Sequence, residues 1–154
     1  QLHRGETVSH SGELYNYKNV IMQPAPTERI PVWVGGASTP ALQRAARNDG
    51  WLGVPLPNKS LKDTVDKLFG FRRDLGKYDQ QFDVVLSPME SIDRNFVDSL
   101  DPAGTYHSSV LPWTPSPWGR AFWVEEGEDH TELEVKFRAM ERFHDMLTDL
   151  GMWD

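Results

Sequence analysis

The stretch from Ile30 to Gly53 restricts the fold of this chain more than any other segment. Residues 30–34 form a continuous apolar run, which is typical of a strand buried on both faces of a parallel sheet. Gly35-Gly36-Ala37 follows as a turn, and a second apolar run begins at Trp51 and ends at Val54. The pattern therefore predicts one strand–turn–helix–strand repeat of a parallel α/β fold.

The helix of this repeat is predicted from the spacing of its apolar residues. Ser38 or Thr39 can cap its N-terminus, and Pro40 suits the first helical position. Asn48-Asp49-Gly50 ends it. The residues that fall on one helical face are Ala41, Leu42, Ala45 and Ala46.

The rest of the chain continues the alternation of helix and strand. We expect a helix from Ser60 to Gly76, with Asp63 in its first turn, a strand at 82–86, a short helix at 91–100 and a strand at 106–111. A capping box at 131–134 begins the longest helix, which runs to Leu150. The apolar side chains expected to pack from the two long helices are Leu61, Val65, Leu68, Leu75, Leu133, Phe137, Met140, Phe143, Leu147 and Leu150. Alternation of this kind predicts a parallel sheet with right-handed crossovers.

Two segments interrupt the alternation. Residues 1–29 are punctuated by Gly, Ser, Asn and Pro and are predicted to be a long connection with short extended pieces around Tyr15, Tyr17, Val20 and Met22. Residues 112–127 are rich in Pro, Trp and Gly and are predicted to be a loop. We therefore expect a connecting segment at 1–29 and an α/β domain at 30–154.

Composition excludes several classes of protein. The net charge of −7 argues against a nucleic-acid partner, and no apolar run approaches the length of a membrane helix. The chain has no cysteine, which excludes disulfides and thiolate chemistry and is compatible with the reducing cytoplasm that we expect as its location. No secretory leader is visible, although the chain begins at Gln1 rather than at methionine.

The strongest chemical signal is the glycine turn. Gly35, Gly36, Ala37, Ser38 and Thr39 lie between a predicted strand and the N-terminus of a predicted helix. Backbone N–H groups and the helix dipole favour an anion at such a place, and glycines let a phosphate approach the backbone. A tight turn with an ordinary capped helix is the simpler alternative, because the motif is neither a Walker loop nor a dinucleotide fingerprint.

Other chemical signals are weak. Glu141 and His144 match one metal-binding pair, but a di-iron site needs two such pairs, so we expect no metal site. Ser108 and Ser109 follow His107 without the elbow motif of a hydrolase. The acidic run at 125–129 is expected to be solvated. Closely spaced tryptophans are typical of either a ligand site or a packed loop, and here they are Trp113, Trp118 and Trp123.

Several motifs together resemble the bacterial luciferase-like oxidoreductases, particularly the members that use a deazaflavin coenzyme. In order along the chain they are Gly5–His10, Gly12–Tyr15, Met22–Pro26, Pro31–Ser38, Arg44–Arg47 and Asp49–Gly53. The close resemblance covers residues 5–54 and becomes looser from there to Val110–Trp113.

The resemblance implies a fold and a function. Members of that family are (β/α)8 TIM barrels that act as monooxygenases, dehydrogenases or reductases on small-molecule substrates, with flavin mononucleotide (FMN) or the deazaflavin coenzyme F-420. By this resemblance residues 35–38 follow the fifth strand and lie near the cofactor phosphate. The chain then carries strands five to eight, the C-terminal half of the barrel, and residues 1–29 are an insertion between strands four and five. No catalytic residue can be transferred, because strands one to four supply the acid–base residues.

Three functional readings follow. The chain is the cofactor-phosphate half of a luciferase-like oxidoreductase and is inactive alone, or it is a binding or assembly module without redox chemistry, or it is a flavodoxin-like flavin-binding domain. A half-barrel has two open sheet edges and an apolar inner face. For the first two readings we therefore expect the chain to pair with a copy of itself or with a complementing N-terminal half.

Overall fold

The computed structural model describes residues 1–109, 111–113 and 123–151. The chain divides into two compact units, residues 1–32 and residues 33–154. The smaller unit contains a 3-10 turn, η1 (Leu2–Arg4), and an antiparallel hairpin of β1 (Val8–Ser11) and β2 (Asn16–Val20). The predicted extended pieces at Tyr17 and Val20 are confirmed as strand, whereas Tyr15 and Met22 lie outside it.

The larger unit is built on a four-stranded parallel sheet. Its strands are β3 (Trp33–Gly35), β4 (Gly50–Leu52), β5 (Asp83–Leu86) and β6 (Thr105–Ser108), in the spatial order β3-β4-β5-β6. The predicted parallel sheet is therefore confirmed. Strands that follow one another in space as in sequence are typical of an arc of a (β/α) barrel, whereas a flavodoxin-like sheet reorders its strands.

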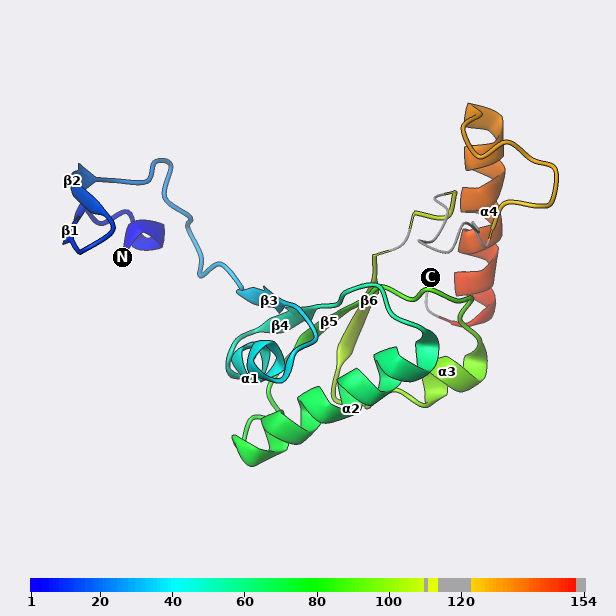
Figure 1. The fold of residues 1–154 in the computed structure, drawn as a ribbon, viewed down its shortest axis with the longest axis horizontal. Coiled ribbons are helices and arrows are strands. Elements are labelled where there is room, and N and C mark those ends of the chain that lie inside the picture. The colour runs from blue at the N-terminus through cyan, green and yellow to red at the C-terminus, as the bar shows by residue number, and fades with distance from the viewer. Residues whose placement is uncertain (110, 114–122, 152–154) are drawn as a thin grey trace. The chain divides into compact units, whose positions relative to one another are not determined.

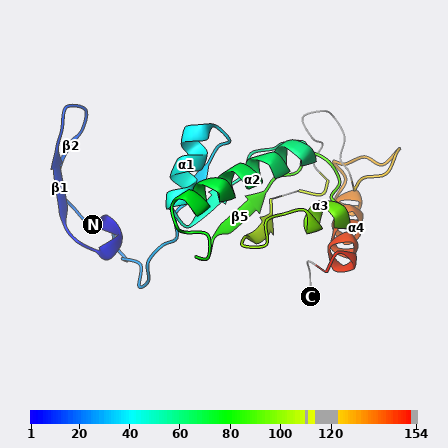
Figure 2. The same cartoon turned by 90° about the horizontal axis from the view of Figure 1, so that it is seen from below.

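Two helices cover one face of this sheet (Figures 1 and 2). They are α1 (Thr39–Arg47) and α2 (Asn58–Asp74). The predicted apolar face of α1 is confirmed as buried, and most of the predicted face of α2 is buried as well. The side chains that form this core from helices and strands are Leu42, Ala45, Ala46, Trp51, Leu61, Val65, Leu68, Phe69, Phe82, Val84, Leu86 and Leu100.

The first strand of the sheet differs from its prediction. Strand β3 begins at Trp33 rather than at Ile30, and Ile30 and Val32 are 42% and 44% exposed. The expected burial on both faces is wrong, because β3 is an edge strand that α1 covers on one side only. Val34 packs toward the helices, and Trp33 on the opposite face stays 43% exposed.

Helix α2 begins earlier than predicted and ends before Leu75. Its first residue is Asn58, so Asp63 lies beyond the first turn. Leu75 is 43% exposed and follows the helix, which makes its predicted place in the core wrong. Gly76 has a φ of 64°, a left-handed conformation that suits the predicted stop.

The C-terminal helices pack on each other. They are α3 (Arg94–Asp98) and α4 (Leu133–Asp149). The Arg94 guanidinium donates to the Asp149 carbonyl at 2.8 Å. The apolar contacts between this region and the C-terminal half of α4 are made by Ile92, Phe96, Val97, Phe143, Met146, Leu147 and Leu150.

Two predictions for α4 are wrong. The Thr131 hydroxyl donates to the Asp129 carboxylate at 2.7 Å, so it does not cap the helix, and Glu132 holds the N-cap position without a side-chain bond. The predicted apolar stripe is buried only toward its C-terminal end, because the first half of α4 buries a different face, which carries Val135 and Ala139. Leu133, Phe137 and Met140 are 67%, 52% and 46% exposed.

Candidate functional site

The glycine turn lies at the C-terminal edge of the sheet, where loops of parallel α/β folds bind ligands. Strand β3 ends at Gly35, and α1 begins four residues later at Thr39. Gly36 has a φ of 98°, a conformation that other residues rarely adopt, and a Cβ on it would lie 3.3 Å from the Ala41 Cβ. The turn therefore depends on glycine at Gly36.

A buried tryptophan holds this turn in place. The indole Nε1 of Trp51 donates to the Gly36 carbonyl at 2.8 Å, and Trp51 is fully buried in the core. The sequence placed Trp51 in a strand but gave no sign of this contact, because it joins residues fifteen positions apart. The strand β4 thus positions the loop that follows β3.

The first turn of α1 presents free backbone donors. Ser38 holds the N-cap position, but its side chain makes no capping bond, and Pro40 is the second helical residue rather than the first. Within the described residues, no side chain caps the N–H groups of Thr39 and Ala41. Ser38, one of the two predicted capping residues, therefore holds the N-cap position but makes no capping bond. Its hydroxyl and the backbone amides of Thr39 and Ala41 are available to an anion.

A cation from another element lies beside these donors. The Nζ of Lys67 on α2 donates to the Thr39 hydroxyl at 2.7 Å. An ammonium next to a helix N-terminus adds to the positive potential of the dipole. Sequence reasoning missed Lys67, because it is 28 residues away and looked like one of many exposed helix residues.

The corresponding end of α2 is already filled by the chain itself. The Glu90 carboxylate accepts from the Asn58 backbone N–H at 2.8 Å, and the Asn58 side chain donates to the Ser91 carbonyl at 2.9 Å. A carboxylate at this place satisfies the helix end in the way a bound anion would. Of these two helix ends, only that of α1 is open to an external anion.

The sheet face away from the helices carries a second group of side chains. The rings of Trp33 and His107 stack with centroids 5.8 Å apart, and the His107 Nε2 lies 3.3 Å from the Asp83 carboxylate. The Trp33 ring covers Gly50, where a Cβ would lie 2.6 Å from the indole Cδ1. Trp33, Gly50 and Asp83 form the row nearest the strand N-termini. His107 lies one row closer to the glycine turn, in register with Val85.

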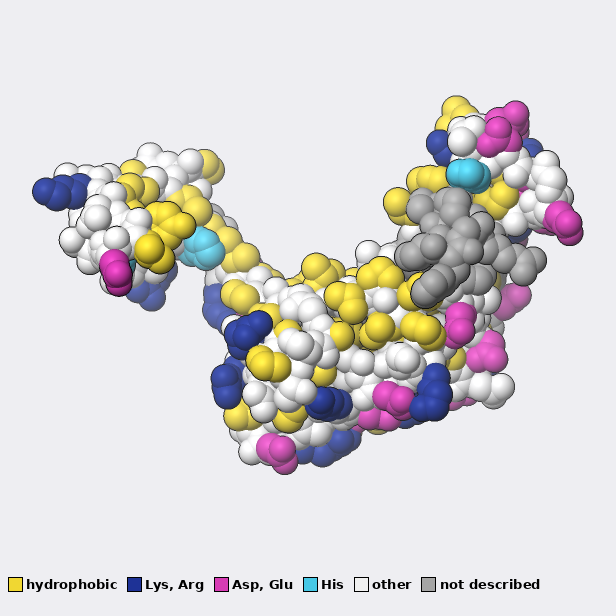
Figure 3. Space-filling model, in the orientation of Figure 1, with side chains coloured by type: hydrophobic (Ala, Val, Ile, Leu, Met, Phe, Trp, Pro, Cys, Tyr) yellow, Lys and Arg dark blue, Asp and Glu magenta, His cyan; other side chains and the backbone are white. Residues whose placement is uncertain are grey.

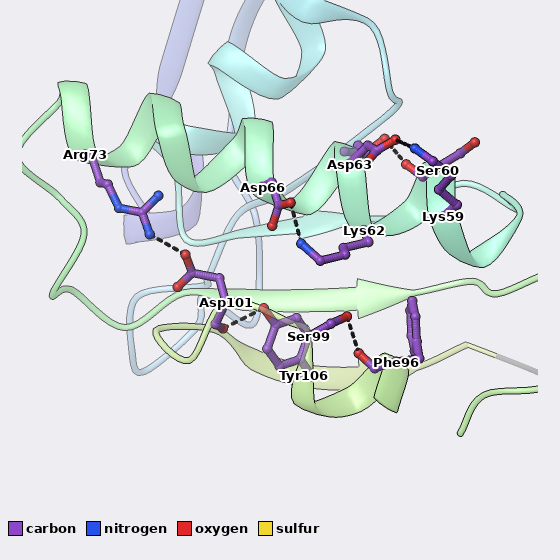
Figure 4. Close-up of polar contacts among 11 residues, drawn as sticks. Lys59, Ser60, Lys62, Asp63, Asp66, Arg73, Phe96, Ser99, Asp101 and Tyr106 are labelled. Atoms are coloured by element: carbon purple, nitrogen blue, oxygen red, sulfur yellow. Dashed lines mark hydrogen bonds and ion pairs between the residues drawn. The ribbon is translucent and has the colours of Figure 1, made fainter. Parts of the chain in front are cut away.

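A polar network on the helix side of the sheet joins the end of α2 to β6 and to the segment before it (Figure 4). Asp101 is buried and accepts from Arg73 and from the Tyr78 hydroxyl at 2.9 Å, while the Tyr106 hydroxyl donates to the Asp101 carbonyl at 2.7 Å. Burial raises the pKa of Tyr106, and the nearby Asp101 carboxylate raises it further. Tyr106 therefore stays a neutral donor, and the network is structural.

The acidic run before α4 is not simply solvated. The Glu128 carboxylate accepts from Arg138 at 2.9 Å and from Arg142 at 2.8 Å, and also from the Glu125 backbone N–H. These bonds, those from Arg142 first, lower the pKa of Glu128 to about 2. The expectation of a solvated run is therefore wrong at Glu128, since the two arginines lie one and two turns into α4.

The remaining chemical signals give no site. Within the described residues no cluster of three or more His, Cys, Asp or Glu could hold a metal ion. The His144 Nδ1 lies 3.3 Å from the Asp145 carboxylate. Trp123 is buried and packs edge-on against Phe143, which fits a packed loop, while Trp118 and most of the predicted loop at 112–127 lie outside the described residues. No helix in the described ranges is long and apolar enough to cross a membrane.

Comparisons with known proteins agree with this geometry. Residues 1–132 match the family described as luciferase-like monooxygenase. Uncharacterized proteins of Mycobacterium bovis and Mycobacterium tuberculosis are 29% identical over 142 residues, which is 90% of this chain. The same residues are 45% of each relative, so the chain spans about half the length of the curated relatives it matches.

Proposed function

Because the chain belongs to the luciferase-like monooxygenase family, we propose that it is the cofactor-phosphate part of an oxidoreductase of that family. In this proposal the four βα units are half of a (β/α)8 barrel, strands five to eight. The sequential parallel sheet with α1 and α2 on one face supports it. The chain is inactive alone, since the other half supplies the acid–base residues.

The observation that carries the proposal is the open N-terminus of α1. The amides of Thr39 and Ala41, the Ser38 hydroxyl and the Lys67 ammonium suit a phosphate that approaches over Gly36. FMN and the deazaflavin coenzyme F-420 both carry such a phosphate. When bound, either group would supply the electron-accepting ring, while these residues hold and orient its phosphate.

Titration of the chain with FMN and with the deazaflavin coenzyme tests the proposal, with fluorescence quenching as the readout. We expect inorganic phosphate to compete and to shift the amide resonances of Thr39 and Ala41. The Lys67→Met variant should bind about fivefold more weakly, since one exposed ion contact contributes about 1 kcal/mol. Lys59→Met is the matched control, because Lys59 lies on the same helix and pairs with Asp63 instead.

Binding of neither coenzyme would contradict the proposal and favour a module without redox chemistry. Coenzyme binding that leaves the Thr39 and Ala41 resonances unchanged would place the phosphate elsewhere. Equal weakening by Lys67→Met and Lys59→Met would show only a general effect of net charge.

A further inference from the structure

A cavity lies in the groove between α1 and α2, near the C-terminal ends of both helices. Its volume is about 240 Å³, and its lining side chains are Gln43, Arg47, Phe71, Asp74 and Leu75. The two helices lie side by side on the same face of the sheet (Figures 1 and 2). Both walls of the cavity are therefore neighbouring helices of this chain, on the side of the sheet that they cover.

Helical spacing explains why these side chains meet. Thr39 and Lys67 face each other in the same groove, where the Lys67 Nζ donates to the Thr39 hydroxyl at 2.7 Å. Arg47 and Leu75 each lie eight residues further along, which is about 12 Å of helix. The two helices thus run in the same direction, and the cavity lies toward the opposite end of the groove from the α1 N-terminus.

Two of the lining side chains are apolar. Phe71 is half-buried and packs against the core, whereas Leu75 is 43% exposed. The sequence predicted Leu75 in the core, yet the fold leaves it at the rim of this cavity. An apolar group bound here would remove both side chains from water, which favours binding.

The two charged side chains of the cavity are unpaired. Within the described residues, neither the Arg47 guanidinium nor the Asp74 carboxylate makes an ion pair, although both line the same space. The cations nearby are engaged elsewhere, since Arg73 pairs with Asp101 and the Lys77 Nζ donates to a backbone carbonyl. Figure 3 shows hydrophobic, basic and acidic side chains close together at the lower left, where Figure 1 places the end of α2.

We propose that this cavity binds a free α-amino acid with an apolar side chain, such as leucine. The ligand carboxylate pairs with Arg47, its ammonium pairs with Asp74, and its side chain covers Phe71 and Leu75. The ends of two helices add a negative potential that favours the ammonium. The volume is smaller than the roughly 300–1,000 Å³ of sites for drug-sized ligands, which favours a ligand of this size.

Nuclear magnetic resonance titration of the isotope-labelled chain with leucine tests the proposal. We expect the backbone amides of Gln43, Arg47 and Leu75 to shift at millimolar leucine, while those of Thr39 and Ala41 stay unchanged. N-acetyl-leucine lacks the ammonium and leucinamide lacks the carboxylate. Each should bind about fivefold more weakly than leucine, since each loses one exposed ion contact.

Variants assign each charge of the ligand to its partner. Arg47→Gln should weaken leucine about fivefold without weakening leucinamide, and Asp74→Asn should weaken leucine without weakening N-acetyl-leucine. Arg44→Gln is the matched control, because Arg44 is an exposed arginine of α1 that does not line the cavity, and it should leave leucine binding unchanged. Far-UV circular dichroism spectra check that every variant is folded.

Three results would overturn the proposal. The first is the absence of shifts at the cavity amides up to about 10 mM leucine. The second is equal binding of leucine by the wild type, Arg47→Gln and Asp74→Asn. The third is binding of N-acetyl-leucinamide, which imitates a residue inside a chain, as tightly as leucine; this would assign the cavity to a protein partner instead. None of these results depends on coenzyme binding, so the proposed function is tested separately.

Discussion

Replacing Arg72 tests how the chain fixes the end of α1 and the entry to β5. The side chain is 1% exposed and stacks over the Phe82 ring at 4.1 Å. Its guanidinium donates to the carbonyls of Lys77 at 2.6 Å, Gln80 at 2.8 Å and Ala46 at 3.3 Å. One cation thus joins the last turn of α1 to the loop before β5.

The expected cost of Arg72→Met follows from these distances. The two short bonds have a charged donor and contribute about 1.5–3 kcal/mol each, while the long bond to Ala46 contributes little. Burial lowers the pKa of Arg72, and its Nε atom is buried without a hydrogen-bond partner, so the variant also removes a desolvation cost. Methionine keeps most of the contact with Phe82. We therefore expect a net loss of about 2 kcal/mol in the free energy of unfolding.

Urea denaturation followed by tryptophan fluorescence measures this loss, with all samples at one protein concentration because association would add to stability. Arg72→Lys should lose at least as much, since an ammonium cannot reach both loop carbonyls and stays buried. Arg44→Met, on the exposed side of α1, should change the free energy by less than about 0.5 kcal/mol. An Arg72→Met variant as stable as the wild type would refute the reasoning, because it would show that the carbonyl bonds only offset desolvation.

Other variants give sharp expectations. Glu128→Gln should detach residues 123–128 from α4, seen as faster hydrogen exchange at the Glu125 amide. In the wild type this attachment should hold above pH 4.5 and be lost only as the pH falls toward the folded-state pKa of about 2, so loss already at pH 5 would contradict the role of Arg142. Gly50→Ala should cost about 1–3 kcal/mol in chemical denaturation, because its Cβ would lie 2.8 Å from the Asp83 backbone oxygen, and unchanged stability would mean that the sheet yields freely. Gly70→Ala, where the Cβ meets nothing, should raise the free energy of unfolding by about 0.5–1 kcal/mol in the same assay, and a decrease would show that the middle of α2 is strained.

The sequence predicted the helix faces better than the strands. Ala41, Leu42, Ala45 and Ala46 were correctly placed in the core, because helical spacing reports the buried side directly. The predicted start of β3 and its burial on both faces were wrong, since an apolar run such as residues 30–34 cannot show whether both faces of the strand are covered. The stripe of α4 was overestimated for the same reason: apolarity predicts that a face is covered but does not identify the covering element.

The candidate site was only partly visible from the sequence. The glycines and hydroxyls of residues 35–39 stand together in the chain, so their turn could be predicted. Lys67 and Trp51 reach the turn through the tertiary fold, and no local pattern reports them. Arg72 was missed because arginine is rarely buried, and its partners are carbonyls of loops that meet only after folding.

The carboxylate of Glu90 at the start of α2 has a consequence for selectivity. A tethered group competes at an effective concentration that the chain sets, whatever the ions in solution. The N-terminus of α2 therefore resembles the site on α1 but is already occupied by the Glu90 carboxylate. A dissolved phosphate meets two similar helix ends and must displace a resident competitor at one of them. Occupancy is thus directed to one end without any difference in the affinity of the backbone donors themselves.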